Sequence, residues 1–341
     1  MSLKTIFEQN PERRYIMFGG KGGLGKTTFS AATAFWLARQ GKKVLVFSVD
    51  PQASLSDIFQ CDIFGKGPVK IMDNLWAQEV DADQHIKEYQ NQIRKKILDM
   101  YGFDAVPDEI EQYIQAASAE PAMEESAIFD AVVDIVVGGE YDYYIYDLVP
   151  LGHALYYLSM AKVYDEWINK ITHLREEMRE YEEMVSRIKR QKETDEDQIL
   201  RELQYIRGRI NASSSILTDR QKTAFFFVVI AEEMVLLDTQ KAAGLFAKFD
   251  VPISGYVVNR VVPQELLQAD IPPYLRNRIE MQGKYLSQID RTFGKQIAAY
   301  VPELERDVTG LAMIERLAGI MYGDGANDDN SRNGRNNQDG A

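Results

Sequence analysis

Short runs of apolar, β-branched and aromatic residues alternate along this chain with segments of helical periodicity. The clearest runs lie at residues 14–18, 43–49, 141–146, 223–230 and 253–258, and two weaker ones at 74–80 and 296–301. Short strands that alternate with helices are typical of a mainly parallel sheet with helices on both faces. The pattern therefore predicts an α/β fold with a doubly wound, mainly parallel sheet.

Two long intervals, residues 82–137 and 152–220, interrupt this alternation. In the second interval, apolar residues recur at spacings of three and four, which predicts an amphipathic helical hairpin. They are Ile168, Ile171, Leu174, Met178, Tyr181, Val185 and Ile188, followed by Ile199, Leu203, Ile206 and Ile210. We interpret both intervals as an α-helical subdomain inserted into a sheet domain of residues 1–81, 138–151 and 221–322. Helices that pack only against one another would show the same spacing.

A glycine-rich segment between the first strand and its helix carries the strongest chemical signal. Residues 19–28 read GGKGGLGKTT and fit the phosphate-loop pattern G-x-x-x-x-G-K-[ST]. Glycines let backbone N–H groups converge on an anion, and the helix N-terminus adds partial positive charge. We expect Lys26 to reach the β- and γ-phosphates of a nucleotide, and the Thr27 hydroxyl to ligate Mg²⁺. The residues expected to contact the nucleotide are Gly20, Lys21, Gly22, Gly23, Leu24, Gly25, Lys26, Thr27 and Thr28.

Two aspartates follow predicted strands at the edge where open α/β sheets bind their ligands. Asp50 comes directly after the strand at residues 43–49, and it could orient or deprotonate an attacking water. Asp147 follows the strand at residues 141–146. Both carboxylates could hold Mg²⁺ through water. Either aspartate could instead only end a strand or cap a helix.

Composition narrows the classes of function. The net charge of −13 works against binding to a phosphate backbone, so we expect no nucleic-acid partner. The apolar runs are far shorter than the ~18 residues of a membrane span, and no secretory signal is evident, so we expect a cytoplasmic protein. One cysteine, Cys61, and three scattered histidines predict no zinc site. Residues 323–341 contain too few apolar side chains to fold, which predicts a disordered tail.

Several segments resemble the arsenical pump ATPase family, which includes the cytosolic factor that delivers tail-anchored proteins to membranes. The loop, with its early lysine Lys21, looks like the deviant phosphate loop of dimeric nucleotide-dependent switches. The segments SVDPQASLSD and DLVPLGHALYYL resemble the two switch regions of the family. The resemblance extends over about residues 14–322, because three later segments are also similar: VVIAEEMVLLDTQKAA, YVVNRVVP and VPELERDVTGLAMIERLA. It implies a P-loop NTPase.

The resemblance also implies roles for single residues. Lys21 would cross a homodimer interface to the partner's nucleotide, although a solvent-exposed loop charge is the simpler alternative. Asp50 would position the hydrolytic water. Glu232 and Asn259 would contact the nucleotide, and pairing of Asn259 with the adenine edge would favour ATP. Residues 147–153 would couple the nucleotide state to the helical subdomain, since family members close around two ATP molecules and open after hydrolysis.

The chain departs from the family pattern at several positions. Cys61 alone cannot supply the three thiolates of an arsenite site within one chain. Residues 270–278 lack the Cys-x-x-Cys pair that bridges eukaryotic-type dimers through zinc, so a dimer would rely on ATP and packing. Ala53 stands where the family often has histidine, and Leu148 replaces the usual threonine. Both changes leave the neighbouring aspartates in place.

Three functions remain open at this point. The first is an ATP-driven targeting factor whose helical subdomain binds the hydrophobic transmembrane segments of client membrane proteins. Met160, Met178 and Met184 would suit such an adaptable surface, although they could equally belong to a core. The second is an arsenite or anion pump ATPase that docks on a membrane transporter or receptor. The third is a positioning ATPase, which often uses a terminal amphipathic helix that the polar tail does not provide.

Overall fold

The computed structural model describes residues 3–50, 52, 54–101, 111, 121–148, 166, 169–170, 173, 198–248 and 251–323. Its centre is an eight-stranded sheet in the order β3-β4-β2-β5-β1-β6-β7-β8. Every neighbouring pair is parallel except β3 and β4, which are antiparallel. The strands are β1 (Tyr15–Gly19), β2 (Val44–Ser48), β3 (Val69–Met72), β4 (Leu75–Glu79), β5 (Tyr143–Asp147), β6 (Thr223–Ile230), β7 (Ile253–Val261) and β8 (Ile297–Pro302).

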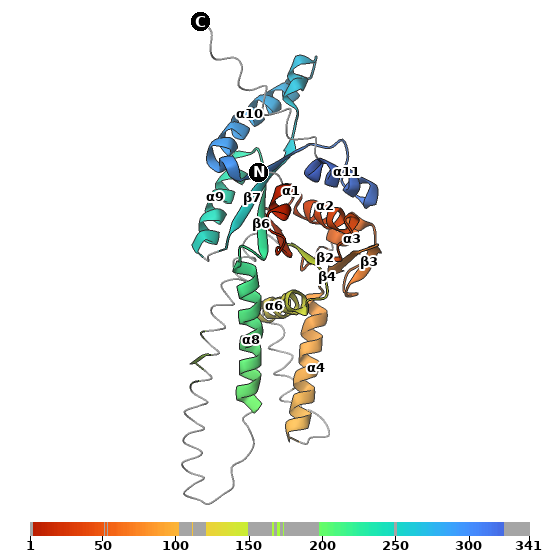
Figure 1. Cartoon of the computed structure of the whole chain (residues 1–341), viewed down its shortest axis with the longest axis vertical. Coiled ribbons are helices and arrows are strands. Elements are labelled where there is room, and N and C mark those ends of the chain that lie inside the picture. The colour runs from red at the N-terminus through yellow and green to blue at the C-terminus, as the bar shows by residue number, and fades with distance from the viewer. Residues whose placement is uncertain are drawn as a thin grey trace, which may run out of the picture.

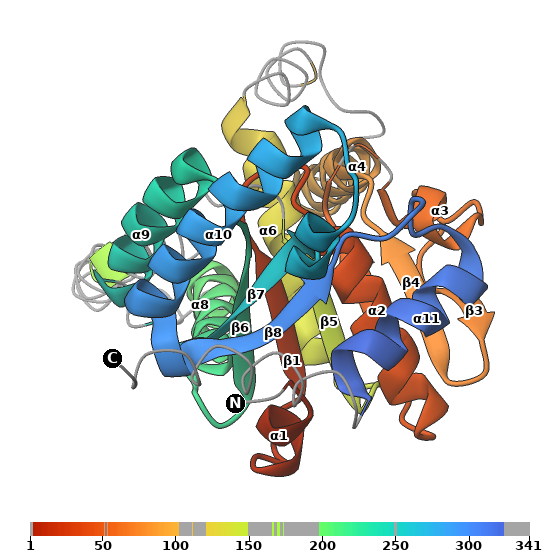
Figure 2. The ribbon, with the colours of Figure 1, turned by 90° about the horizontal axis from the view of Figure 1, so that it is seen from above.

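Helices cover both faces of this sheet (Figure 2). One face carries α2 (Lys26–Arg39), α3 (Ser54–Phe59) and α11 (Gly310–Tyr322), and the short helix α1 (Leu3–Glu8) packs against α11. The opposite face carries α9 (Glu233–Lys248) and α10 (Pro273–Phe293). Two 3-10 turns, η1 (Gln264–Gln268) and η2 (Gly294–Gln296), flank α10. The predicted doubly wound, mainly parallel α/β fold is therefore confirmed.

Three further helices lie at one end of the sheet (Figure 1). They are α4 (Ala82–Tyr101), α6 (Pro121–Gly138) and α8 (Gln198–Thr218). Two of them, α4 and α8, extend away from the sheet, and α6 lies across between their upper ends. Helix α6 packs against both others, and an ion pair joins Arg209 of α8 to Asp134 of α6. No described helix is long and apolar enough to cross a membrane. The division into a sheet domain and a helical subdomain stays a prediction.

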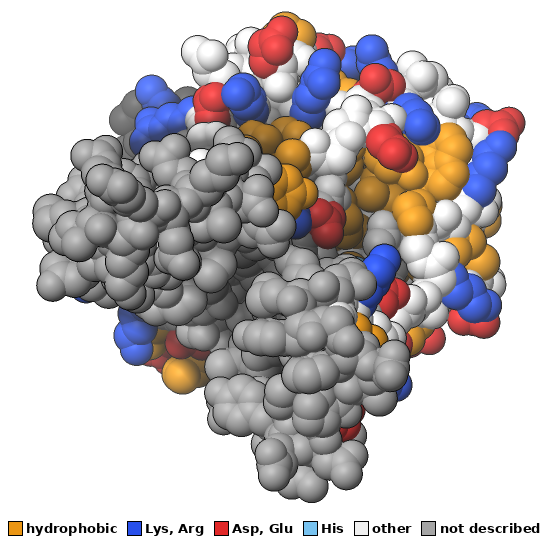
Figure 3. Space-filling view, turned by 90° about the horizontal axis from the view of Figure 1, so that it is seen from below, with side chains coloured by type: hydrophobic (Ala, Val, Ile, Leu, Met, Phe, Trp, Pro, Cys, Tyr) orange, Lys and Arg blue, Asp and Glu red, His pale blue; other side chains and the backbone are white. Residues whose placement is uncertain are grey.

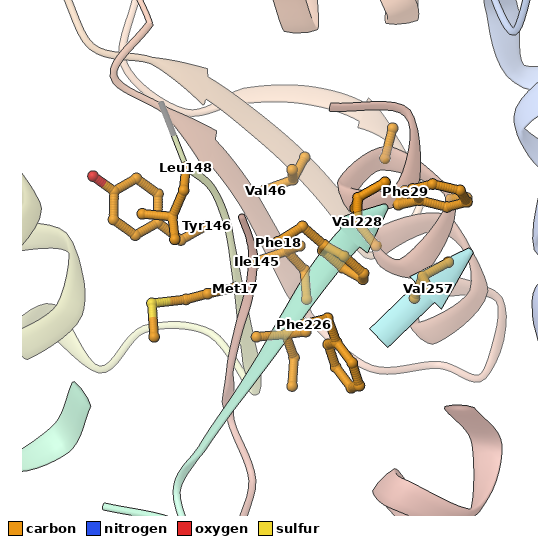
Figure 4. Close-up of a cluster of buried hydrophobic side chains, with 14 of the residues drawn as sticks. Met17, Phe18, Phe29, Val46, Ile145, Tyr146, Leu148, Phe226, Val228 and Val257 are labelled. Carbon is orange, nitrogen blue, oxygen red and sulfur yellow. The ribbon is translucent and has the colours of Figure 1, made fainter. Parts of the chain in front are cut away.

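The central strands are hydrophobic at nearly every position because helices cover both faces of the sheet. All eight residues of β6 are buried, as are all five of β2. Phe18 of β1 stacks on Phe226 of β6 and on Phe29 of α2, with ring centroids 5.4 and 6.3 Å apart (Figure 4). This cluster holds the last residues of β1 and the first turn of α2, which are the two ends of the glycine-rich loop.

All seven strands predicted from the apolar runs are present, with ends that shift by at most three residues. The eighth strand, β3, escaped prediction because it has four residues, lies at the sheet edge and is only partly buried. The helix predicted around Ile199 to Ile210 is α8. The first helix of the predicted hairpin, from Ile168 to Ile188, lies outside the described residues apart from residues 169, 170 and 173. The tail beyond residue 323 also lies outside them.

Candidate functional site

The glycine-rich loop, residues 20–25, joins β1 to α2 above the ends of β6 and β7. Gly20 has φ +151°, and a Cβ added there would lie 2.7 Å from the Val228 carbonyl oxygen. Gly25 has φ +95°, and a Cβ there would lie 2.8 Å from Nδ2 of Asn259. Any side chain at these positions would therefore collide with the neighbouring strands and strain the backbone. Glycine at these two positions of the phosphate-loop pattern is therefore required by the lack of space for a side chain.

Lys26, the first residue of α2, turns its side chain back over the loop. Its Nζ donates a hydrogen bond to the Lys21 carbonyl at 3.4 Å. Burial lowers the pKa of Lys26, and the carboxylates of Asp147 and Asp50 act in the opposite direction. An ammonium group held above a glycine-rich loop at a helix N-terminus is a suitable partner for an anion.

Asp147, the last residue of β5, is only 3% exposed and lies beneath the same helix end. The Ser30 hydroxyl donates to its Oδ1 at 3.4 Å, and the Thr27 side chain also hydrogen-bonds to it. Burial raises the pKa of Asp147 to about 7, although Thr27 and Lys26 favour the ionised form. The structure thus brings together the predicted residues Thr27, Lys26, Asp50 and Asp147.

Asp50 begins a segment that is fixed at both ends. Its backbone N–H donates to the Ser48 hydroxyl at 3.1 Å, and its Oδ1 accepts from the Gln52 N–H at 3.0 Å. At the far end, the buried carboxylate of Glu79 accepts hydrogen bonds from the Leu55 N–H at 2.6 Å and from the Ser56 hydroxyl. Glu79 was not predicted as a site residue, because its place near the end of a predicted strand does not show which backbone groups it contacts.

Lys21 and Glu232 have more exposed positions. The Lys21 ammonium lies 3.2 Å from Oδ2 of Asp238 on α9, and about half of its side chain is exposed. Glu232 follows β6, is exposed, and uses its backbone N–H to bond the Ile230 carbonyl at 2.8 Å. Asp238 was not predicted, because a helix between strands gives no sign of which residue faces the loop. The predicted roles of Lys21 and Glu232 stay predictions.

Asn259, near the end of β7, contacts the loop directly. Its Nδ2 donates to the Leu24 carbonyl at 2.9 Å. The neighbouring Arg260, which was not predicted as a site residue, donates to the Gly23 carbonyl at 3.1 Å. The predicted adenine contact of Asn259 remains a prediction, since an amide group can bond both the loop and a base.

The predicted second switch region can be located only in part. Leu148 is buried behind Asp147, whereas residues 149–153 and Ala53 of the first switch region lie outside the described residues. The methionines Met160, Met178 and Met184 also lie outside them. Cys61 is partly buried, and the described part of the chain holds no cluster of three His, Cys, Asp or Glu side chains placed for a metal ion.

The side-chain oxygens at the site fit the way Mg²⁺ is usually bound, with few protein ligands and several waters, better than they fit a metal site enclosed by protein ligands. Thr27 offers a hydroxyl and Asp147 a carboxylate, and these two side chains already contact each other. Mg²⁺ commonly binds through one or two protein oxygens and keeps several waters and substrate phosphates. Thr27 would hold the ion directly, and Asp147 and Asp50 would hold it through water, as the sequence predicted.

The buried Asp147 predicts a contribution to the stability of the ligand-free protein that is lost as the pH rises from about 4 to about 7. The pKa of Asp147 is about 7 in the folded chain and 3.8 for an ordinary aspartate. In this window the folded chain retains a proton that the unfolded chain has lost, so lowering the pH favours folding. Urea unfolding of Asp147→Asn should show a shallower pH dependence than wild type.

The exposed Asp62 provides a control for this measurement, because Asp62→Asn also removes a carboxylate. The pH dependence of its unfolding should stay close to that of wild type. A wild-type slope retained in Asp147→Asn would mean that the carboxyl group is not the source of the effect.

Comparison with known proteins identifies the family. The model of the anion-transporting ATPase family matches residues 13–323. The chain is 33% identical over 323 residues to "Putative arsenical pump-driving ATPase 1" of Aquifex aeolicus, covering 91% of this chain and 79% of that protein. It is 28% identical to "ATPase ASNA1 homolog 2" of Paramecium tetraurelia, covering 94% and 96% of the two chains. It is also 28% identical to "ATPase GET3A" of Arabidopsis thaliana, covering 93% and 86%.

The family match spans nearly the whole described chain, and the glycine-rich loop, Lys26 and Asp147 lie together at the ends of the parallel strands. The chain is therefore an ATPase with a P-loop NTPase fold, and it belongs to the anion-transporting ATPase family.

Proposed function

We propose that this ATPase is a homodimeric, Mg²⁺-dependent cytoplasmic switch that binds transmembrane segments of client membrane proteins and delivers them to a membrane. The resemblance to the family that includes the tail-anchored targeting factor supports this proposal. Relatives named GET3 and ASNA1 cover almost the full length of the chain. The proposal requires that nucleotide binding change the arrangement of helices that contact the client.

The connection between the site and the helices carries the proposal. Helix α6 ends at Gly138 and leads into β5, which ends at Asp147 in the site. Helix α4 begins at Ala82, close after Glu79, whose carboxylate holds the segment that follows Asp50. A short connection therefore links Glu79 to α4, and strand β5 itself links Asp147 to α6, which enters β5 at the opposite end; α4 and α6 pack on each other. If hydrolysis moved the segment after Asp50 or the end of β5, α4 or α6 would be displaced with it.

The described part of the helical layer has exposed apolar and aromatic side chains. Tyr205 of α8 is 63% exposed and Val137 of α6 is 43% exposed. In the face seen from below, the described side chains include hydrophobic ones next to charged ones, although the view does not mark which elements carry them (Figure 3). Single exposed apolar side chains are common on protein surfaces, so they leave room for a client-binding surface without identifying one.

The alternative is an anion pump ATPase that docks on a membrane transporter. The name of the Aquifex relative favours it. The single cysteine weighs against a thiolate site for arsenite within one chain. The two functions differ in one readout, because a pump ATPase should hydrolyse ATP faster when arsenite or antimonite is present.

Lys21 would join the partner's nucleotide when the dimer closes. In the single chain its ammonium pairs with Asp238, and both side chains are substantially exposed. An exposed ion pair of this kind contributes only about 0.2–1 kcal/mol. Exchange of Asp238 for a phosphate on the partner is therefore energetically accessible, since phosphate oxygens carry more charge.

Lysine substitutions test the roles in the loop. We expect Lys26→Ala to abolish ATP binding, because it removes the cation that lies over the loop. Lys21→Ala should retain much of the binding while hydrolysis falls by about 10³-fold, the size of effect known for a cation supplied in trans. Nucleotide titration and phosphate release on the purified protein would separate the two, with the exposed Lys42→Ala as matched control.

Asp238→Asn distinguishes a role in trans from an intrachain role of Lys21. If Lys21 acts on the partner's nucleotide, loss of Asp238 should leave hydrolysis near the wild-type rate. A loss as large as that of Lys21→Ala would mean that the intrachain ion pair is what hydrolysis requires.

Client binding is tested with Asp50→Asn, which should bind ATP and hydrolyse it slowly. We expect this variant, purified with Mg²⁺ and ATP, to co-elute on sizing with a protein that carries one C-terminal transmembrane helix. A client whose helix is interrupted by two arginines is the control and should elute alone. Failure of every intact helix to associate, with ATP bound, would refute the targeting function while leaving the ATPase assignment unaffected.

A further inference from the structure

Two consecutive side chains at the end of β7 hold two consecutive carbonyls of the phosphate loop. Nδ2 of Asn259 donates to the Leu24 carbonyl at 2.9 Å, and the Arg260 guanidinium donates to the Gly23 carbonyl at 3.1 Å. The two residues also bond each other, since the Arg260 N–H donates to Oδ1 of Asn259 at 2.8 Å. This arrangement, which we call the loop clamp, joins segments that are more than 230 residues apart in sequence.

The clamp requires an unusual backbone conformation. Successive side chains of a regular strand point to opposite faces of the sheet, so two neighbours do not normally reach the same loop. Arg260 has φ +56°, in the left-handed region that residues with a Cβ rarely adopt. The regular pairing of β7 with β8 is also shifted between Val258 and Val261. The departure from strand geometry is what brings both side chains to the loop.

A buried glutamine fixes the backbone two residues after this strained residue. Gln282 of α10 is 7% exposed, and its Oε1 accepts from the Val262 N–H at 3.2 Å. Its Nε2 donates to the Val262 carbonyl at 3.3 Å. Both polar groups of Val262 are thereby held by one side chain. A strained residue that persists in such a setting is over-determined by its surroundings, which is typical of functional sites.

The geometry of the peptide bond shows what the clamp does to the loop. In a trans peptide the carbonyl of one residue and the N–H of the next point in opposite directions. Holding the carbonyls of Gly23 and Leu24 toward β7 therefore turns the N–H groups of Leu24 and Gly25 away from β7. They then face the inner side of the loop, where a phosphate binds by converging amides.

We propose that Arg260 is a positioning residue of the ATPase, which, through the loop clamp, orients the loop amides before the nucleotide arrives. Preorganisation of this kind lowers the cost of binding and affects the ground state and the transition state equally. Loss of the guanidinium should therefore raise the KM for ATP without lowering kcat. This role is separate from the adenine contact predicted for Asn259.

Two substitutions in the full-length chain separate the guanidinium from the strained backbone. Arg260→Met retains a long side chain and the strained φ but loses the donor. Arg260→Gly loses the donor and also relieves the strain. Both should raise the KM for ATP and the Kd for ADP by about tenfold, which corresponds to roughly 1.4 kcal/mol. The kcat should stay within about twofold of wild type, and the Tm of ligand-free Arg260→Gly should equal or exceed that of wild type.

The opposite signs for Arg260→Gly, weaker nucleotide binding and undiminished stability, distinguish positioning from a structural contribution to the fold. An unchanged KM in either variant would overturn the proposal. A fall in kcat with unchanged KM would also overturn it, since Arg260 would then act in the chemical step. So would a rise in KM that is accompanied by a lower Tm of ligand-free Arg260→Gly, because the loop would then be loosened only through the fold.

Discussion

The site depends on a loop whose peptide groups are divided between the protein and the nucleotide. The carbonyls of Gly23 and Leu24 accept hydrogen bonds from Arg260 and Asn259 of β7, respectively. Backbone carbonyls carry a strong need for partners, and a loop without regular structure must find them elsewhere. Because the protein supplies donors on the outer side of the loop, the N–H groups of the same peptides are directed to the inner side. The loop is thereby built to bind an anion.

The carboxylates of Asp147 and Asp50 limit how much further negative charge the site can accept without added cations. Asp147 is buried at the end of β5, and Lys26 and Asp50 lie close enough to influence its protonation. A nucleotide adds several negative charges to this region, so cations must accompany it. Mg²⁺ and a second lysine would supply the positive charge that offsets the phosphates. The proposed closure of a dimer around ATP, with Lys21 donated by each chain, therefore agrees with the charge balance of the isolated site.

Much of the fold and part of the site could be predicted from sequence, and the physical reason is locality. The apolar runs revealed seven strands because the central strands are buried on both faces and the outer ones retain apolar positions, and GGKGGLGKTT revealed the loop because its glycines lie within one short segment. Asp50 and Asp147 could be placed near the loop because parallel strands end at one edge. The pair of Lys21 and Asp238 could not be predicted, since the two residues are 217 positions apart and neither side chain is part of a periodic pattern.

Glu79 and Arg260 escaped prediction for a related reason. Each is an ordinary polar residue at a strand end, and its significance lies in the backbone that it contacts. Glu79 accepts from the first turn of α3, and Arg260 donates to the loop from a left-handed conformation that no sequence pattern around it required. Both act on main-chain groups, which every residue possesses. Contacts of this kind appear only when the chain is folded.

Lys21 combines the two kinds of contact, and this explains how one residue could act in two states. Its carbonyl is held within the chain by Lys26, so its backbone position is set by the loop. Its side chain is half exposed and makes only a weak surface ion pair among the interactions described here. Because the backbone and the side chain are held separately, the ammonium group can change partners without disturbing the amides that bind phosphate. A switch residue needs this separation. If the change of ion-pair partner also distorted the loop, closing the dimer would weaken the binding of the nucleotide, and nucleotide binding is what would drive closure.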